Sequence, residues 1–281
     1  MGGTHNFMWR LASALVLAPA AIVIAYLGGW PFVCTFAIAA IAILWEWTAL
    51  AFRAAELRVL APGLGALLLA MALAGAGQPT AAIGMVVLGA VLAAAAVAAW
   101  PPRRFAAVNQ PAWAGAGVIY AGVALLGPVL LRGSQRPGFA ALLYLFAIVW
   151  TTDIFAYLIG RAFGGPLLWP ALSPKKTWSG AIGGLAGGVA AGTAVAYASL
   201  GTAPLVAGVL AVILSISAQS GDLLESAVKR RFGAKDASHL IPGHGGVMDR
   251  LDGFLVAACV AVLIGSLHQG IAASAQGLLA W

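Results

Sequence analysis

Four polar side chains share one face of an apolar stretch that ends near residue 228. Asp222, Ser226, Lys229 and Arg230 are spaced at i, i+4, i+7 and i+8, which places them on the same side of a helix. An acid, a hydroxyl and two cations suit a metal–phosphate complex, because the acid can hold the cation while the bases contact phosphate oxygens. The spacing therefore predicts a site for a phosphorylated ligand. The alternative is that Asp222 is only a structural partner of Lys229 or Arg230.

A second group of acids follows in the chain. Asp249 and Asp252 are three residues apart, so a helix would place them side by side, where two carboxylates repel each other. A shared Mg²⁺ removes this repulsion, and Mg²⁺ prefers hard oxygen ligands. The pair therefore predicts a metal site, unless Asp249 and Arg250 form only a solvated loop pair.

The loop before these acids is rich in glycine. Residues 242–246 place His244 among three glycines, and such a turn allows backbone N–H groups to approach phosphate closely. The same loop contains Lys235 and Asp236. We expect these residues to contribute to ligand binding, although His244 can equally be an ordinary polar residue.

Another group lies on a single helical face further upstream. Asp153, Tyr157 and Gly160 follow one another at helical spacing, and Arg161 comes next. Because an acid inside an apolar stretch is costly, it usually has a partner or a function. We therefore count Asp153 and Tyr157 among the candidate binding residues.

A basic segment precedes the apolar stretch that begins near residue 177. Lys175, Lys176 and Thr177 stand there, and a helix N-terminus beside two lysines is a natural anion site. Ser173 is a candidate cap for the helix. The lysines can also be topological anchors alone.

Membrane-spanning helices must position these side chains. Apolar residues make up 62% of the 281 residues and charged residues 8%, against about 25% charged residues in a soluble domain. A bilayer relieves such a chain of a water-facing surface, and about 20 apolar residues span its core as a helix. We expect an all-α polytopic integral membrane protein with nine spans, at roughly 9–28, 31–52, 59–76, 80–100, 111–131, 138–162, 177–200, 203–228 and 251–270.

The basic residues predict the orientation of these spans. With a cytoplasmic N-terminus, thirteen of the fifteen lysines and arginines lie on the inside, as the positive-inside rule requires. The polar loops at 161–176 and 229–250 then face the cytoplasm. Most acids follow residue 150, so we expect 1–137 to be a transmembrane scaffold and 138–281 to be the catalytic region. Topology and phosphate-bearing ligands explain the net charge of +7, and we expect no nucleic-acid partner.

One acid stands apart in the first half of the chain. Glu46 lies between Trp45 and Trp47 inside an apolar stretch. An acid at such a position is rare and often functional. Its residue type and neighbours do not indicate which role it has.

Three segments together resemble a known family. Residues 226–252 are similar, at fixed spacings, to the signature of the phosphatidate cytidylyltransferases, also called CDP-diacylglycerol synthases. Residues 153–161 and 173–180 also resemble this family, whereas the spans before residue 138 resemble it only in hydropathy. The resemblance implies a polytopic helical membrane protein, usually dimeric, that converts CTP and phosphatidic acid into CDP-diacylglycerol and pyrophosphate with Mg²⁺.

The resemblance also implies roles for the candidate residues. Metal binding falls to the acids that match the family's centre, with K⁺ as a candidate second cation: Asp222, Asp249 and Asp252. Basic side chains would contact phosphate oxygens: Lys175, Lys176, Lys229, Arg230, Lys235 and Arg250. Asp153 would hold a lysine or a metal-bound water, and His244 would bind phosphate or assist the proton balance. The enzyme would be a homodimeric, multi-pass protein of the bacterial inner membrane, with its active site facing the cytoplasm.

Two other functions are compatible with parts of the pattern. A CTP-dependent kinase of polyprenols or phytol has a similar C-terminal half, but it would transfer the γ-phosphoryl group and release CDP. A transporter would explain many spans and intramembrane acids. It would also predict paired inverted halves with broken helices near the midplane, whereas the polar residues here gather toward one end of one half.

Overall fold

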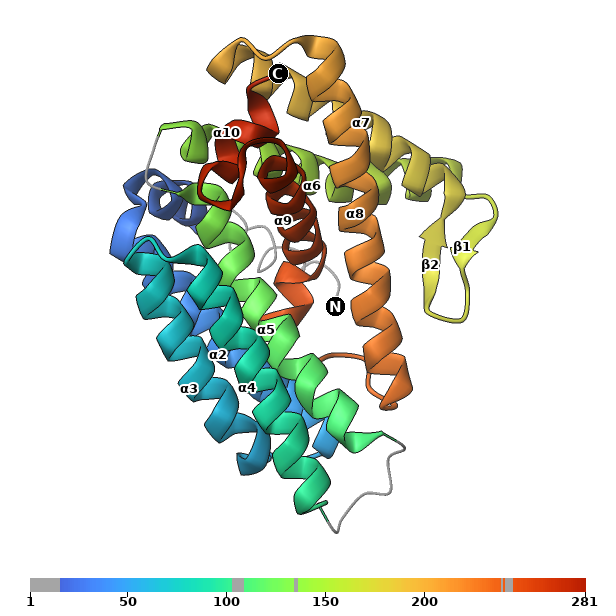
Figure 1. Ribbon diagram of the computed structural model, residues 1–281. Helices are drawn as coiled ribbons and strands as arrows, with labels where there is room; N and C mark the ends of the chain where they lie inside the picture. Colours follow the sequence, from blue (N-terminus) through green and yellow to red (C-terminus); the bar gives the residue numbers. More distant parts are fainter. Residues whose placement is uncertain (1–15, 103–108, 134–135, 239, 241–244) are drawn as a thin grey trace. The chain divides into compact units, whose positions relative to one another are not determined.

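The all-α class is confirmed by the computed structural model, which describes residues 16–102, 109–133, 136–238, 240 and 245–281. Eight helices within these residues are long and apolar enough to cross a membrane (Figure 1). They are α2 (Gly29–Phe52), α3 (Leu57–Gly75), α4 (Pro79–Ala99), α5 (Gln110–Arg132), α6 (Arg136–Phe163), α7 (Trp178–Leu200), α8 (Pro204–Arg231) and α9 (Met248–Gln269). A 3₁₀ helix η1 (Ile271–Ala273) and α10 (Ser274–Leu279) follow.

The eight helices coincide with eight of the nine predicted spans. The remaining predicted span, at 9–28, lies partly outside the described residues, and its described part forms the apolar helix Val16–Leu27. Local sequence explains several boundaries. Pro79 and Pro204 open α4 and α8, where a missing N–H carries no penalty, and Gly201 ends α7 in the left-handed conformation with φ of 68°.

The chain divides into two compact units. The first, called the N-terminal unit here, contains the described residues of Met1–Val129 and of Ala234–Arg250; the C-terminal unit contains those of Leu130–Gly233 and Leu251–Trp281. The polar loop that follows α8 therefore packs with the first helices of the chain. The functional division predicted at residue 137 concerns roles rather than packing, and it stays a prediction.

Small residues allow the helices of the N-terminal unit to pack closely. A Cβ atom on Gly63 of α3 would lie 2.7 Å from the Leu44 side chain of α2. The Trp47 indole N–H donates a hydrogen bond of 2.9 Å to the Trp113 carbonyl, and its ring stacks on Tyr120 at 5.3 Å between centroids. Helix α2 is thereby fixed against α5 by both hydrogen bonding and aromatic contact.

In the C-terminal unit, a glycine stripe on α7 faces α6. A Cβ atom would lie 2.7 Å from the Ala156 carbonyl at Gly180, and 2.7 Å from the Thr152 carbonyl at Gly184. No larger side chain fits at this separation, so the glycines set the distance between the two helices. Helix α8 also contacts α6, through the buried hydrogen bond of 2.8 Å between the hydroxyls of Thr152 and Ser215.

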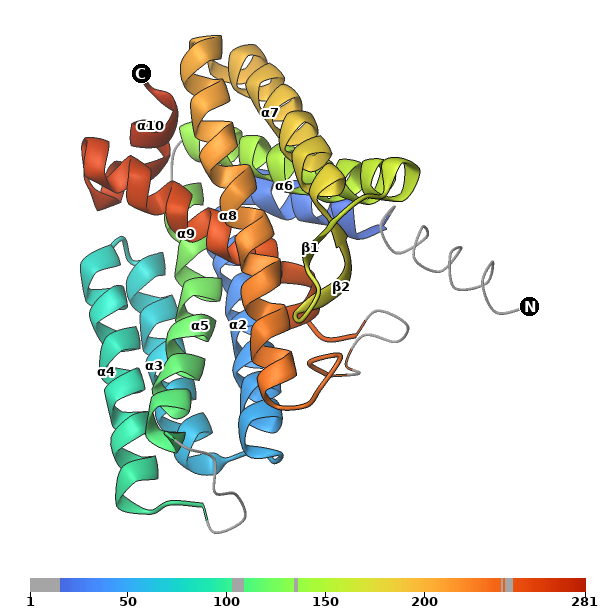
Figure 2. The same ribbon diagram turned by 90° about the vertical axis from the view of Figure 1, so that its right-hand side faces the viewer.

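A short antiparallel hairpin connects α6 to α7. Its strands are β1 (Leu167–Trp169) and β2 (Ser173–Thr177), and Figure 2 shows β2 leading into the start of α7. The sequence analysis expected a loop at 161–176 and did not predict these strands. It was also wrong about the cap, because Ser173 begins β2 whereas Thr177 caps α7 by accepting a hydrogen bond of 3.1 Å from the Gly180 N–H.

Candidate active site

The C-terminal unit contains a cavity of about 520 Å³. This volume lies within the range of roughly 300–1,000 Å³ found for small-molecule sites. Its polar or charged lining residues come from α6, the hairpin, the start of α7 and α8: Asp153, Tyr157, Arg161, Lys175, Lys176, Thr177, Gln219 and Asp222. Three groups that the sequence analysis treated separately therefore meet around one space.

Helix α6 contributes one polar stripe to the cavity. Asp153, Tyr157 and Gly160 all line it, which confirms the helical face predicted from their spacing. The Arg161 guanidinium donates a hydrogen bond of 2.8 Å to the Tyr157 hydroxyl. This hydrogen bond holds the phenol oxygen and the guanidinium together at the wall of the cavity.

The hairpin contributes the two adjacent lysines. Lys175 and Lys176 are the third and fourth residues of β2, and Thr177 ends the strand. Gly160 and Gly180 leave room for the Thr177 hydroxyl, which lies 2.9 Å and 3.2 Å from the positions where their Cβ atoms would be. The helix N-terminus and the lysines thus open onto the cavity together, as an anion site requires.

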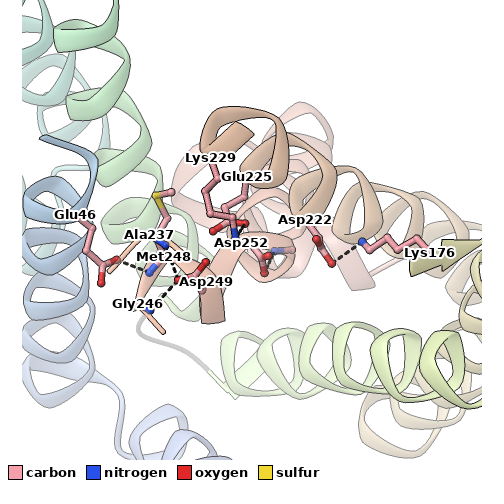
Figure 3. Close-up of polar contacts among 11 residues, drawn as sticks. Glu46, Lys176, Asp222, Glu225, Lys229, Ala237, Gly246, Met248, Asp249 and Asp252 are labelled. Carbon is pink, nitrogen blue, oxygen red and sulfur yellow. Dashed lines mark hydrogen bonds and ion pairs between the residues drawn. The ribbon is translucent and has the colours of Figure 1, made fainter. Parts of the chain in front are cut away.

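One ion pair joins two walls of the cavity. Lys176 Nζ lies 2.5 Å from Asp222 Oδ2 (Figure 3), and the two side chains are 29% and 35% exposed. The alternative pairing of Asp222 with Lys229 or Arg230 is therefore not the ion pair observed. Partly exposed pairs stabilise a fold by only about 0–1 kcal/mol, so either partner can exchange the other for a ligand at small cost.

Acidic charge accumulates beside this pair. The carboxylates of Asp153, Asp222 and Asp252 repel one another electrostatically, and Lys176 offsets part of the repulsion. The Gly253 N–H donates a hydrogen bond of 2.7 Å to Asp252 Oδ1. Oxygen donors carrying excess negative charge are the kind that fit a hard divalent cation. Among the residues that the structure describes, however, no three acid, histidine or cysteine side chains are grouped as ligands of a single ion.

Lys229 has a partner that the sequence analysis missed. Its Nζ lies 2.5 Å from Glu225 Oε2, with side chains 12% and 1% exposed. The signal was present in the sequence, since a glutamate four residues before a lysine on a helix favours an ion pair. Lys229 is thus held by a buried acid, while Ser226 is half-buried and Arg230 exposed on the same helix.

Asp249 belongs to a network within the N-terminal unit. Its Oδ2 accepts hydrogen bonds of 2.9 Å from the Ala237 N–H and 2.8 Å from the Gly246 N–H (Figure 3). Two backbone donors of the loop therefore hold the carboxylate, and the alternative of a loop pair with Arg250 stays a prediction. Helix α9 begins at Met248, so Asp249 and Asp252 lie one turn apart on it, as predicted.

Three other predicted residues of this loop lie at the surface of the described structure. Lys235, Asp236 and Arg250 are exposed, and His244 lies outside the described residues. An exposed cation such as Lys235 can attract an incoming polyanion through solvent. Their proposed roles stay predictions.

Glu46 of α2 holds the same loop at a different point. It is fully buried and accepts three hydrogen bonds: 2.6 Å from the Ser238 hydroxyl, 2.8 Å from the Val247 N–H and 2.7 Å from the Met248 N–H. The sequence analysis could not assign it a role, because these partners are 192 or more residues away in the chain.

Comparisons with known proteins agree with the motifs. The model of the Cytidylyltransferase family matches residues 8–268. The chain belongs to this family. A phosphatidate cytidylyltransferase of Brucella abortus biovar 1 (strain 9-941) is 43% identical over 265 residues, which cover 93% of this chain and 94% of the relative. A phosphatidate cytidylyltransferase of Staphylococcus aureus (strain COL) is 39% identical over 139 residues, or 49% of this chain and 52% of that protein.

The family match confirms the resemblance drawn from three motifs, and it extends well beyond them. It includes the helices before residue 138, for which hydropathy had been the only sign of kinship. Glu46 therefore lies within the part of the chain that the cytidylyltransferase family model matches.

Proposed function

We propose that this chain is a phosphatidate cytidylyltransferase that transfers the cytidylyl group of CTP to phosphatidic acid. The observation that carries the proposal is the 43% identity, across 93% of the chain, to a protein of that name. The cavity of the C-terminal unit supports the proposal. Lysines, an arginine and acids line it, and its volume is typical of a small-molecule site.

In the proposed reaction, a phosphate oxygen of phosphatidic acid attacks the α-phosphorus of CTP. A new P–O bond forms, the bond to the β-phosphate oxygen breaks, and pyrophosphate leaves with that electron pair. The nucleophile is already an anion, so the protein needs no strong base. The main difficulty is to bring two polyanions together, and positioning with charge neutralisation supplies most of the catalysis.

Basic groups of the C-terminal unit supply the positive charge in this proposal. Lys175, Lys176 and Arg161 bind phosphate oxygens, and Lys176 exchanges its Asp222 partner for one of them. The N-terminus of α7, capped by Thr177, adds the positive end of a helix dipole. Lys229 is fixed by Glu225 and contributes its charge from a set position.

We propose Asp222, Asp249 and Asp252 as the residues that hold Mg²⁺. Their carboxylate oxygens have the chemistry that Mg²⁺ prefers, and the repulsion between Asp222 and Asp252 favours a bound cation. When bound, the ion would neutralise charge on the transferring phosphates. K⁺ remains the candidate second cation.

The proposal also covers the membrane location, the orientation and the assembly of the protein. The acyl chains of phosphatidic acid would stay in the bilayer of a bacterial inner membrane, while CTP reaches the headgroup from the cytoplasm. The bias of lysines and arginines toward one side of the membrane supports this orientation. A homodimer is the expected assembly.

A product assay tests the proposal. Purified protein with Mg²⁺, phosphatidic acid and CTP labelled in the α-phosphate should yield labelled CDP-diacylglycerol and equimolar pyrophosphate. A chelator should abolish the reaction, and added Mg²⁺ should restore it. In a parallel reaction with a polyprenol in place of phosphatidic acid, release of labelled CDP with a phosphorylated polyprenol would identify the kinase instead, and no lipid product with either acceptor would refute both.

A further inference from the structure

We infer that Glu46 is a positioning residue that fixes the loop carrying Asp249, and thereby aligns this proposed metal ligand for the reaction. The inference rests on the proposed function for its catalytic consequence, but its structural basis is independent. All of the contacts involved lie within the N-terminal unit.

The Glu46 carboxylate joins two ends of the loop. Oε1 accepts hydrogen bonds from the Ser238 hydroxyl and the Val247 N–H, while Oε2 accepts one from the Met248 N–H. Ser238 precedes the glycine-rich segment at 242–246, and the other two donors follow it. A single side chain therefore holds Ser238 together with Val247 and Met248.

The same carboxylate caps α9. Met248 begins the helix and Val247 precedes it, so their N–H groups are among the donors that have no partner inside the helix. Valine has no side-chain oxygen with which to cap the helix locally. Glu46 satisfies both donors from a different helix, and its charge complements the positive end of the helix dipole.

The position of Glu46 is fixed by its burial and by the packing of α2. It is fully buried, and burial of a carboxylate is costly unless hydrogen bonds replace its water. The three hydrogen bonds supply that replacement. The neighbouring Trp47 ties α2 to the Trp113 carbonyl of α5, so Glu46 cannot follow a displaced loop without disturbing the helix packing.

Gly246 connects Glu46 to Asp249. A Cβ atom on Gly246 would lie 2.5 Å from Glu46 Oε1, so the carboxylate lies directly against this backbone. The N–H of the same residue donates to Asp249 Oδ2. The position of the Asp249 carboxylate thus depends on a backbone segment that Glu46 holds from the other side.

The test compares Glu46→Gln with Glu56→Gln. Glu56 lies in the same unit and has local contacts with Arg58 at the start of α3, a hydrogen bond from its N–H and an ion pair with its guanidinium, so its variant is the control for loss of a carboxylate charge. In Glu46→Gln an amide NH₂ faces a backbone N–H. We expect the amides of residues 245–250 to exchange hydrogen about tenfold faster, which corresponds to a loss of about 1.4 kcal/mol, because their hydrogen bonds to a charged group are weakened.

Turnover supplies the second readout. We expect Glu46→Gln to lower kcat by about 10- to 100-fold, the loss typical when support of a metal ligand is removed, and to raise the Mg²⁺ concentration needed for half-maximal activity. The KM for CTP should change much less than kcat. Glu56→Gln should retain wild-type exchange in residues 245–250 and wild-type turnover.

Gly246→Ala provides an independent variant. It keeps the Glu46 carboxylate but pushes it away from the loop, so it should reproduce both effects even if Glu46→Gln fails to fold. Wild-type exchange at 245–250 together with wild-type turnover, in either folded variant, would overturn the inference. If the wild-type protein makes no CDP-diacylglycerol, the proposed function fails, while the exchange comparison still decides whether Glu46 holds the loop.

Discussion

Two acids proposed as ligands of one metal are held in different ways in the two units. Asp249, in the N-terminal unit, accepts hydrogen bonds from two backbone N–H groups. Asp222, in the C-terminal unit, pairs with the flexible ammonium group of Lys176, and both side chains remain about one-third exposed. One acid is fixed by the main chain, whereas the other has a partner that can leave.

The difference separates two tasks that a site for two polyanions must perform. A carboxylate bound by backbone donors keeps its position when ligands come and go, because the donors belong to the fold. A carboxylate bound by a lysine changes partner when phosphate oxygens arrive, which releases the lysine for substrate.

The largest loss of activity is expected when either Asp222 or Asp249 loses its negative charge, because both are proposed ligands of Mg²⁺. Asp222→Asn and Asp249→Asn keep the side-chain shape but remove the negative charge, so each should lower CDP-diacylglycerol formation at least about 100-fold. The α-labelled CTP assay measures this loss, with thermal unfolding as the test of folding. A folded variant that retains most of its activity would remove that acid from the proposed metal site.

A smaller loss is expected when the exchangeable partner is removed. Lys176→Met keeps much of the aliphatic stem and deletes the charge, so kcat/KM should fall about tenfold or more, in line with the loss of a hydrogen bond to a charged group. Lys176→Arg should retain a larger share of the activity. Equal losses in the two variants would show that more than the positive charge matters at this position.

Both acids are expected to be required for activity, so amide hydrogen exchange should distinguish how each is held. Asp249→Ala removes the acceptor of two backbone N–H groups, so the amides of Ala237 and Gly246 should exchange at least several-fold faster. Asp222→Ala should leave both amides unchanged, because Asp249 is the acceptor of both hydrogen bonds and Asp222 pairs with Lys176 instead. Similar acceleration in both variants would contradict the contrast between the two acids.

The smallest effect is expected at Thr177, a cavity residue whose hydroxyl accepts a hydrogen bond from the Gly180 N–H. Thr177→Val deletes the cap of α7 and should lower the free energy of unfolding by about 1 kcal/mol, whereas Thr177→Ser should keep the cap. Denaturant titration of the purified protein in detergent measures both values. A Val variant as stable as the Ser variant would show that the Thr177 hydroxyl does not stabilise the start of α7.

Sequence reasoning was reliable where distance along the chain determines distance in space. The spacing of Asp153, Tyr157 and Gly160 predicted a shared helical face, and all three line the cavity. The apolar stretches predicted the spans for the same reason, since helix length must match the bilayer. The pair formed by Glu225 and Lys229 followed the same rule and could have been predicted.

Contacts between distant elements were beyond the same reasoning. Glu46 and Met248 are 202 residues apart, and periodicity within a helix does not indicate which loop a buried acid will meet. The cap of α7 was missed for a local reason. Ser173 and Thr177 are both suitable capping residues, and only the pairing of β2 with β1 shows that the chain remains extended until Thr177.

The direct passage from β2 into α7 bears on how this region can be altered by insertion. The strand ends at Thr177 and the helix starts at Trp178, so one added residue between them would either slip the register of β2 or rotate α7 by about 100° relative to the hairpin. At the other end of the hairpin, the turn closed by the Leu172 N–H and the Trp169 carbonyl connects the strands without lining the cavity. Tags and natural length variation should therefore be accommodated at this turn and excluded from the junction.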